Sequence, residues 1–236
     1  MSDGDAQTGG EALIVDSWHR NAQAWTAAVR SQRIESRALV TDRAIVDAVL
    51  SRSPQCVLDI GCGEGWLGRA LTASGVESVG IDVVPSLIAQ AQVQAEVPAA
   101  GVGDFRVISY EQLAAGALGI TADVAVCNFS LLGKESVDTV FAAMPSLLKP
   151  RGAFIIQTLH PIVACGERPY QDGWREGSWA GFGAEFTDPA PWYFRTLGSW
   201  LQLLRRHRLR LLELREPLHP RSGLPASVIF IADVTE

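Results

Sequence analysis

The chain has 236 residues, of which 47% are apolar and 19% charged, and its formal net charge is −6. This length suits one α/β domain with a modest insertion, and the apolar share is ample for a buried core. The negative charge argues against non-specific binding of nucleic acid. No apolar run approaches the length of a membrane span, and the acidic, glycine-rich start of the chain does not have the pattern of a signal peptide.

The four cysteines follow no metal-binding or thiol-pair spacing. They are Cys56, Cys62, Cys127 and Cys165. Two of them fall in or beside predicted buried strands, where a free cysteine behaves as a small apolar residue. We therefore expect reduced thiols in a cytoplasmic protein and no bound metal ion.

Hydrophobic periodicity predicts helices that alternate with strands. Residues 1–10 are expected to form a disordered tail, 16–29 a helix capped by Asp16, and 30–37 a polar, mobile connector. Further helices are expected over 42–52, 66–74, 85–97, 112–117, 137–148 and 197–206. Strands are expected over 56–60, 78–81, 105–108, 124–127, 153–158, 209–214 and 227–232. This alternation indicates an α/β fold.

The stretch from Gln55 to Leu71 joins a buried strand, a glycine-rich turn and a helix. Gly61, Gly63 and Gly65 crowd the turn, where glycine allows a positive φ or a close approach of the backbone to a ligand. This order is typical of a nucleotide-type binding loop. Because Gly63-x-Gly65-x-x-Gly68 also fits a dinucleotide fingerprint, an NAD(P)-dependent oxidoreductase is a second interpretation.

Two acidic residues favour a cationic ligand over a pyrophosphate at this loop. Asp59 lies at the end of the strand and Glu64 in the turn. Like charges at about 4 Å cost about 1 kcal/mol in water and about 4 kcal/mol near a protein surface. S-adenosylmethionine (SAM) instead offers a cationic sulfonium, an amine and ribose hydroxyls. The chain also has no Tyr-x-x-x-Lys pair to carry hydride chemistry.

The segment D-I-G-C-G-E-G at 59–65 resembles the glycine-rich motif of class I, Rossmann-like SAM-dependent methyltransferases. Three more blocks occur in the order of that family: 79–82 resembles its second strand, 122–132 its fourth strand and loop, and 147–158 its fifth strand. The joint order is more specific than any single block. The resemblance is strongest to the small-molecule branch, such as quinone-biosynthesis methyltransferases.

The resemblance implies a seven-stranded, mostly parallel sheet with helices on both faces. It implies that the last strand inserts antiparallel between the fifth and the sixth. Residues 1–53 are then a tail and lid helices, and 54–236 are the SAM-binding methyltransferase domain. An ordinary amphipathic helix packed on the sheet is the alternative to a lid. Within that domain, an aromatic insertion over about 160–196 would cover the substrate.

The resemblance and the strand-tip rule together predict the residues that bind SAM. Asp82 ends the second strand, where a carboxylate accepts hydrogen bonds from two ribose hydroxyls; capping the next helix is its alternative role. The resemblance places the adenine near Ser109 or Tyr110. It places the methyl donor beside the loop after the fourth strand. The full expected set is Asp59, Gly61, Cys62, Gly63, Gly65, Asp82, Val83, Ser109, Tyr110, Asn128 and Phe129.

The acceptor side is expected to be aromatic. Residues 160–191 show little periodicity and are rich in glycine, proline and aromatic side chains, and such walls suit a planar or apolar acceptor. A loop sealed by its own tryptophans is the alternative. In the family, amino-methylating DNA enzymes carry Asn/Asp-Pro-Pro-aromatic after the fourth strand; the segment 128–130 lacks the proline pair, which argues against DNA base methylation. The expected acceptor contacts are Trp18, His19, Trp174, Trp179 and Tyr193.

In-line methyl transfer needs alignment and exclusion of water, and a hydroxyl acceptor also needs a general base. His160, at the tip of the fifth strand, is the first candidate, although Pro161 would also fix a plain turn histidine there. His19, Glu185 and Asp188 are weaker candidates. The sequence thus predicts a SAM-dependent methyltransferase with a small-molecule acceptor. An NAD(P)-dependent oxidoreductase and a non-catalytic SAM-binding module are its alternatives, and the oligomeric state stays open.

Overall fold

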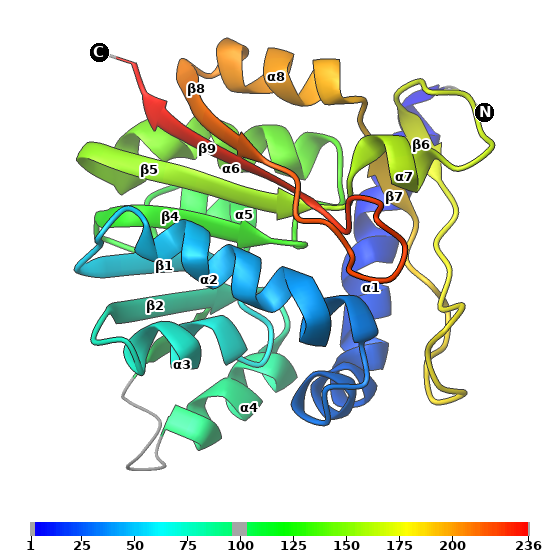
Figure 1. The fold of residues 1–236 in the computed structure, drawn as a ribbon, viewed down its shortest axis with the longest axis horizontal. Helices are drawn as coiled ribbons and strands as arrows, with labels where there is room; N and C mark the ends of the chain where they lie inside the picture. Colours follow the sequence, from blue (N-terminus) through cyan, green and yellow to red (C-terminus); the bar gives the residue numbers. More distant parts are fainter. Residues whose placement is uncertain (1–2, 96–102, 236) are drawn as a thin grey trace.

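The structure, a computed structural model, describes residues 3–95 and 103–235. Seven strands form one sheet in the order β3-β2-β1-β4-β5-β9-β8 (Figure 1). They are β1 Cys56–Ile60, β2 Glu77–Asp82, β3 Asp104–Val107, β4 Ala122–Asn128, β5 Leu148–Thr158, β8 Leu209–Arg215 and β9 Val228–Val234. β9 pairs antiparallel with both β5 and β8, whereas the pairs among β1 to β5 are parallel. The α/β fold and the antiparallel last strand are confirmed.

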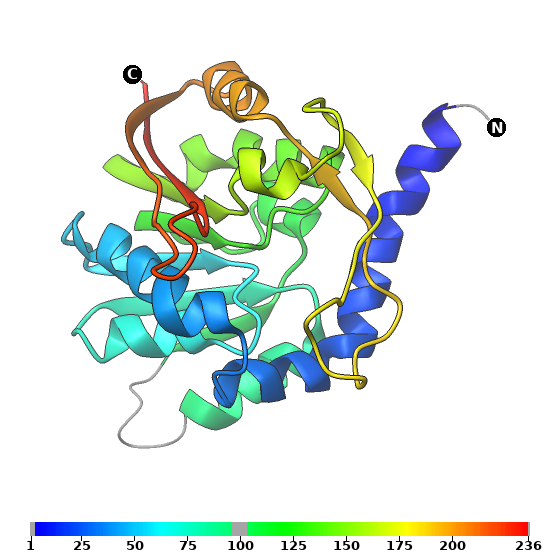
Figure 2. The same ribbon diagram turned by 45° about the vertical axis from the view of Figure 1, so that its right-hand side comes forward.

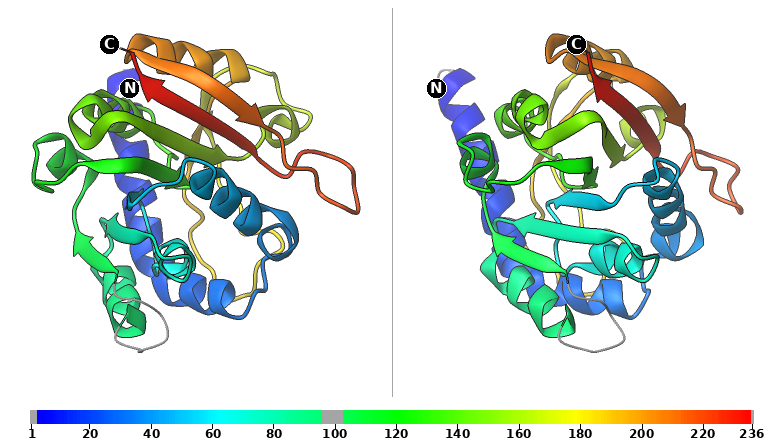
Figure 3. Two further views of the ribbon diagram at one scale, coloured as in Figure 1. Left: turned by 60° about the vertical axis from the view of Figure 1, so that its left-hand side comes forward. Right: turned by 90° about the vertical axis from the view of Figure 1, so that its left-hand side faces the viewer.

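Helices cover both faces of the sheet (Figure 3). They are α2 Asp42–Leu50, α3 Trp66–Thr72, α4 Pro85–Ala95, α5 Tyr110–Ala114, α6 Glu135–Leu147 and α8 Leu197–Arg206. Successive side chains of a strand point to opposite faces. Leu58 and Ile60 therefore enter the core under α5, α6 and α8, while Val57 enters the core under α2 and α3. The predicted end of the fourth helix at residue 97 lies outside the described residues.

Helix α1 (Asp3–Arg30) runs along the carboxyl ends of the strands (Figures 1 and 2). It begins at Asp3, so the expected tail to residue 10 and the expected helix start at Asp16 are wrong where the structure describes them. The helix is held by a distant partner, because Glu11 accepts hydrogen bonds from backbone amides at the start of α6. Local composition carries no signal of such a contact. No described helix is long and apolar enough to cross a membrane.

The connector after α1 is also more ordered than expected. A π-helical turn, η1 (Arg37–Thr41), leads directly into α2. Thr41 precedes α2 as expected, but its side chain makes no capping hydrogen bond. The non-helical link is therefore limited to residues 31–34.

The segment after β5 contains more regular structure than its sequence suggests. It forms α7 (Pro161–Cys165) and an antiparallel ribbon of β6 (Gly173–Arg175) and β7 (Trp192–Phe194). Pro161 suits the first helical position because its fixed φ is helical and its missing amide needs no partner there. Residues 176–191 adopt neither helix nor strand and pass beside α1 (Figure 2).

Candidate active site

A cavity of about 720 Å³ lies between α1 and the carboxyl ends of β1, β2 and β4. Open α/β sheets bind their ligands at this edge. The glycine turn, the tip of β2 and the loop after β4 line one end of the cavity. Side chains of α1 and of residues 177–195 line the other end. Within the described ranges, no cluster of histidine, cysteine or acidic residues is arranged to hold a metal ion.

The glycine turn is shaped by groups from two neighbouring strands. Gly61 has φ +76°, and a Cβ at this position would collide with Ser130. Ser130 Oγ donates to the Ile60 carbonyl at 2.7 Å, which holds the loop after β4 against the turn. Asp82 Oδ2 accepts from the Gly63 amide at 3.0 Å. The carboxylate at the tip of β2 therefore fixes the turn and also lines the cavity.

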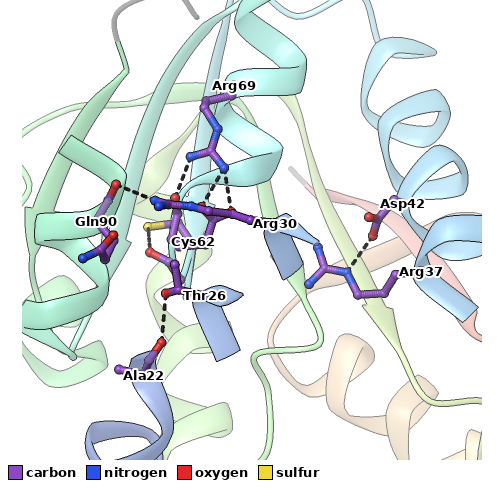
Figure 4. Close-up of polar contacts among 10 residues, drawn as sticks. Ala22, Thr26, Arg30, Arg37, Asp42, Cys62, Arg69 and Gln90 are labelled. Atoms are coloured by element: carbon purple, nitrogen blue, oxygen red, sulfur yellow. Dashed lines mark hydrogen bonds and ion pairs between the residues drawn. The ribbon is translucent and has the colours of Figure 1, made fainter. Parts of the chain in front are cut away.

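Glu64 does not face the cavity, which corrects the electrostatic argument made from the sequence. Its side chain is buried, and its carboxylate pairs with Arg69 at 2.6 Å and with Arg30 at 3.0 Å. The side chains of Arg30 and Arg69 reach this turn from α1 and α3 (Figure 4). Two guanidinium groups thus neutralise the charge that was expected to repel a pyrophosphate. The carboxylate instead joins α1 to α3, because Arg30 belongs to α1 and Arg69 to α3.

Asp59 is also turned away from the cavity. It is 2% exposed, and burial together with the nearby Asp82 raises the pKa of its carboxyl from 3.8 to about 7. Arg37 opposes this shift. Burial raises the pKa of Asp82 as well, while the amides of Val84 and Gly63 lower it. Of the carboxylates of Asp59, Glu64 and Asp82, only that of Asp82 belongs to a residue that lines the cavity.

Most residues predicted to bind SAM line the cavity. They are Gly61, Cys62, Gly63, Asp82, Val83, Ser109, Tyr110, Asn128 and Phe129. Asp59 and Gly65 are not among the lining residues. Gly65 has φ +81°, and Phe105 of β3 and Ala91 of α4 leave no room for a Cβ there, so it lets the start of α3 pack against both elements. Ser109 also caps α5 in a capping box with Gln112.

Arg37 is a site residue that the sequence reading missed, because a polar stretch predicted only a connector. Its side chain is 9% exposed and lines the cavity. Its Cζ lies 4.7 Å from the Trp66 ring centroid, and its Nε donates to Asp42 at 2.9 Å. Its Nη2 and the Oδ1 of Asn128 are buried without a hydrogen-bond partner in the described part of the chain. Unpaired buried groups cost about 1–3 kcal/mol, so both atoms are candidates for ligand contacts.

The other end of the cavity is closed by α1 and residues 177–195, which we call the cover. Ring contacts join the two segments, with Trp18 lying 5.9 Å from Trp179 and Trp25 lying 6.3 Å from Phe182. Asn21 is fully buried, and its side-chain amide exchanges hydrogen bonds of 2.7 and 2.9 Å with the backbone of residue 187. The cover is therefore one packed unit made of sequence-distant parts.

The cover places some of the predicted acceptor contacts in the cavity and leaves others out. Trp18, Trp179 and Tyr193 line it. Trp174 does not, because its ring packs against Gly10 and the edge of Tyr193. His19 lies on the exposed side of α1.

None of the predicted general bases lines the cavity, although Leu159 and Pro161, on either side of His160, do. His160 is 5% exposed and is absent from the lining residues, and its Nε2 lies 2.7 Å from Glu216 Oε1. Glu185 pairs with Arg33 and Asp188 with Arg20 on the outside of the cover. None of the four candidates, His19 included, lines the described cavity, so the geometry gives no support to a base at these positions.

The sequence model of a methyltransferase-domain family matches residues 30–213. This match covers well over half of the chain, so the chain belongs to that family. The methyltransferase expected from the sequence is confirmed by this family, and its class I, Rossmann-like fold is confirmed by the order of the sheet and by the solved structures described below.

Curated relatives are ubiquinone biosynthesis O-methyltransferases. The chain is 34% identical to that of Xanthomonas axonopodis pv. citri over 119 residues, which are 50% of this chain and 49% of the relative. It is 36% identical to that of Xanthomonas campestris pv. campestris (strain B100) over 108 residues, 46% of this chain and 44% of the relative. The chain thus matches about half the length of these relatives.

Solved structures share the fold at lower identity. A SAM-dependent methyltransferase from Listeria monocytogenes superposes with a TM-score of 0.62 at 19% identity, covering 82% of this chain and 97% of the other. A magnesium protoporphyrin IX methyltransferase from Synechocystis PCC 6803, solved with bound SAM, gives 0.57 at 17% identity, covering 85% and 80%. At these identities the likeness concerns the fold alone.

Proposed function

We propose that this protein transfers a methyl group from SAM to a small-molecule acceptor held beneath the cover. The main support for this proposal is a single cavity whose two ends are lined by different kinds of residues. Its first end, which we call the cofactor end, is a glycine turn held by Asp82. Its second end, which we call the acceptor end, is walled by aromatic side chains. The names of the curated relatives support a small acceptor and transfer to oxygen.

The residues present fit SAM. The cradle at Gly61 admits no Cβ, and the carboxylate of Asp82 can accept hydrogen bonds from hydroxyl groups. Ser109 and Tyr110, which the resemblance assigns to the adenine, also line the cavity. When bound, SAM supplies a methyl group on a positively charged sulfur, which is a good leaving group. We assign the unpartnered Nη2 of Arg37 to the carboxylate of the methionine moiety, because a buried guanidinium prefers an anionic acceptor.

We assign the second unpartnered atom, the Oδ1 of Asn128, to the ammonium of the same moiety. An amide oxygen is an acceptor, whereas Arg37 offers only donors. The two assignments place a donor against the anion and an acceptor against the cation.

The cover supplies alignment and exclusion of water. Correct orientation of two reactants lowers a barrier by about 7–11 kcal/mol. We also propose that residues 1–53 and about 160–196 act as the covering parts of a catalytic domain that spans 54–236. We further propose a cytoplasmic location, which the four free cysteines support.

Titration calorimetry tests the cofactor part. We expect binding of SAM and S-adenosylhomocysteine, and no binding of NADH at the same concentration. Asp82→Ala should weaken the binding free energy by about 1–3 kcal/mol, because ribose hydrogen bonds are lost. The binding free energy of Asp82→Asn, which keeps one acceptor oxygen, should lie between those of the wild type and of Asp82→Ala.

Tight NADH binding, or no SAM binding, would contradict the proposal and favour the oxidoreductase. A methyl-transfer assay with labelled SAM over a panel of acceptors separates an enzyme from a non-catalytic SAM-binding module. The module would bind SAM and modify none of the panel.

A further inference from the structure

Arg195 is a buried cation at the acceptor end of the cavity. It follows β7 directly, its side chain is 7% exposed, and it lines the cavity. Its Cζ lies 4.9 Å from the ring centroid of Tyr193 and 5.1 Å from that of Trp200. The guanidinium is therefore held between two aromatic rings that belong to the same wall.

The polar partners of Arg195 are neutral. Nη1 donates to the Gly133 carbonyl at 2.8 Å, and Nη2 donates to the Lys134 carbonyl at 3.0 Å. Among the described residues, no carboxylate lies within ion-pair distance of this guanidinium. Burial lowers the pKa of Arg195 to about 10, although the more distant Asp172, Glu11 and Asp138 oppose this shift, so the group still carries its charge at neutral pH. A buried charge without a counterion in direct contact is costly to keep.

The one carboxylate that lines this end is committed elsewhere. Glu11 accepts hydrogen bonds from the backbone amides of Lys134 and Glu135, at 2.6 and 2.9 Å, and from Ser136 Oγ at 2.6 Å. These donors stand at the N-terminus of α6, where the helix dipole stabilises a negative charge. Glu11 thus compensates the helix end, and it acts on Arg195 only from beyond ion-pair distance.

We propose that the acceptor is an apolar, planar molecule that carries a carboxylate or an equivalent anionic oxygen group, and that Arg195 binds this group. The inference rests on the proposed methyltransferase function and narrows its substrate class. The rings of Trp18, Trp179 and Tyr193 would hold the planar body. A guanidinium binds such an anion through charge-assisted hydrogen bonds that a neutral isostere does not offer.

The test uses calorimetry on the full chain saturated with S-adenosylhomocysteine. The probes are 2-naphthoate and 2-naphthamide, which share one ring system and differ in charge. We expect the wild type to bind the acid about tenfold or more tightly than the amide. Arg195→Gln should lose this preference, whereas Arg195→Lys should keep part of it.

Arg175 provides the matched control. It is also buried, its Cζ lies 4.2 Å from the Phe194 ring centroid, and its guanidinium donates to backbone carbonyls, but it does not line the cavity. Arg175→Gln should therefore keep the full preference for the acid. Unchanged melting temperature and unchanged affinity for S-adenosylhomocysteine would show that each variant is folded.

Equal affinity of the wild type for the two probes, or no binding of either, overturns the inference even if Arg195→Gln fails to fold. A preference that survives in Arg195→Gln overturns it as well. Because S-adenosylhomocysteine binding is measured separately, its loss in the wild type would count against the proposed function itself.

Discussion

The two ends of the cavity are built from different kinds of segments. At the cofactor end, Gly61, Gly63 and Asp82 follow directly from strands β1 and β2, which are neighbours in the sheet. At the acceptor end, the wall joins α1 to the insertion, and Asn21 bonds to a residue 166 positions away. Parallel strands bring their carboxyl ends to one edge of the sheet, whatever segments cover that edge. The cover, in contrast, depends on tertiary contacts between segments that are far apart in the sequence.

The two ends also differ in their charged groups. The cofactor end presents the carboxylate of Asp82 and the guanidinium of Arg37, whereas the acceptor end presents the guanidinium of Arg195 and the carboxylate of Glu11, which is held by amides at the start of α6. Glu64 is the link between them, because it ties the first helix of the cover to the helix that follows the glycine turn. Substitutions at Glu64, Asp59 and Arg37 test this difference between the two ends.

Glu64→Gln should have the largest effect. The substitution leaves Arg30 and Arg69 without their shared counterion, and breaking a buried ion pair from one side costs about 3–5 kcal/mol. Because both arginines are partly exposed, at 32% and 20% of their side chains, we expect a loss near 3 kcal/mol in the free energy of unfolding by the same reasoning. Urea denaturation measures it.

The exposed pair of Glu185 and Arg33 is the control for this change. Glu185→Gln should alter the free energy of unfolding by less than about 1 kcal/mol. Equal losses in the two variants would show that Glu64 is not a structural link between the ends.

Asp59→Asn should change the pH dependence of stability. The folded-state pKa of about 7 lies above the ordinary 3.8, so folding takes up a proton between these values. The stability of the wild type therefore falls as the pH rises through this window and stays lower above it. Asparagine cannot ionise, so the variant should gain about 2–3 kcal/mol relative to the wild type between pH 5 and pH 8.

Denaturation curves of both proteins at pH 5 and at pH 8 give this difference. Comparing the two proteins at each pH removes the contribution of titrating groups that do not interact with Asp59. A constant difference between variant and wild type at the two values would mean that Asp59 does not titrate in this range.

Arg37→Gln should have the smallest effect, a moderate loss of affinity for the cofactor product. It tests whether Arg37 belongs to the cofactor end. The affinity for S-adenosylhomocysteine should fall about tenfold, as expected for one hydrogen bond between charged groups. The affinity for 5′-methylthioadenosine, which lacks the amino acid moiety, should not change. Arg43→Gln, at a highly exposed position, is the control. An equal loss for both ligands would assign Arg37 to the fold of the turn instead.

The glycine turn shows how far a sequence pattern reaches. The strand, the glycines and the strand-tip acid were placed correctly, because each follows from periodicity or from a backbone need within a few residues. Glu64 lies in the same turn, yet the prediction that its carboxylate faces the ligand was wrong. Arg30 and Arg69 decide that direction, and Arg30 comes from a helix whose position over the sheet no local pattern describes.

Arg37 and the start of α1 show the same limit. A polar stretch predicted a mobile connector, and an acidic stretch predicted a tail, since composition records only the average solubility of a segment. Burial of the Arg37 guanidinium between Trp25 and Trp66 depends on rings from two other elements. The anchoring of α1 depends on donors at the start of α6, more than a hundred positions away.

By itself, the sequence determined the alternation of strands and helices, the class of methyltransferase and the cofactor end of the cavity, because these depend on short-range periodicity and on the convergence of parallel strands. Only the tertiary structure decided which charges are neutralised, which candidate bases do not line the cavity and which buried cations do. Those outcomes depend on burial and pairing, and these arise only when distant segments meet.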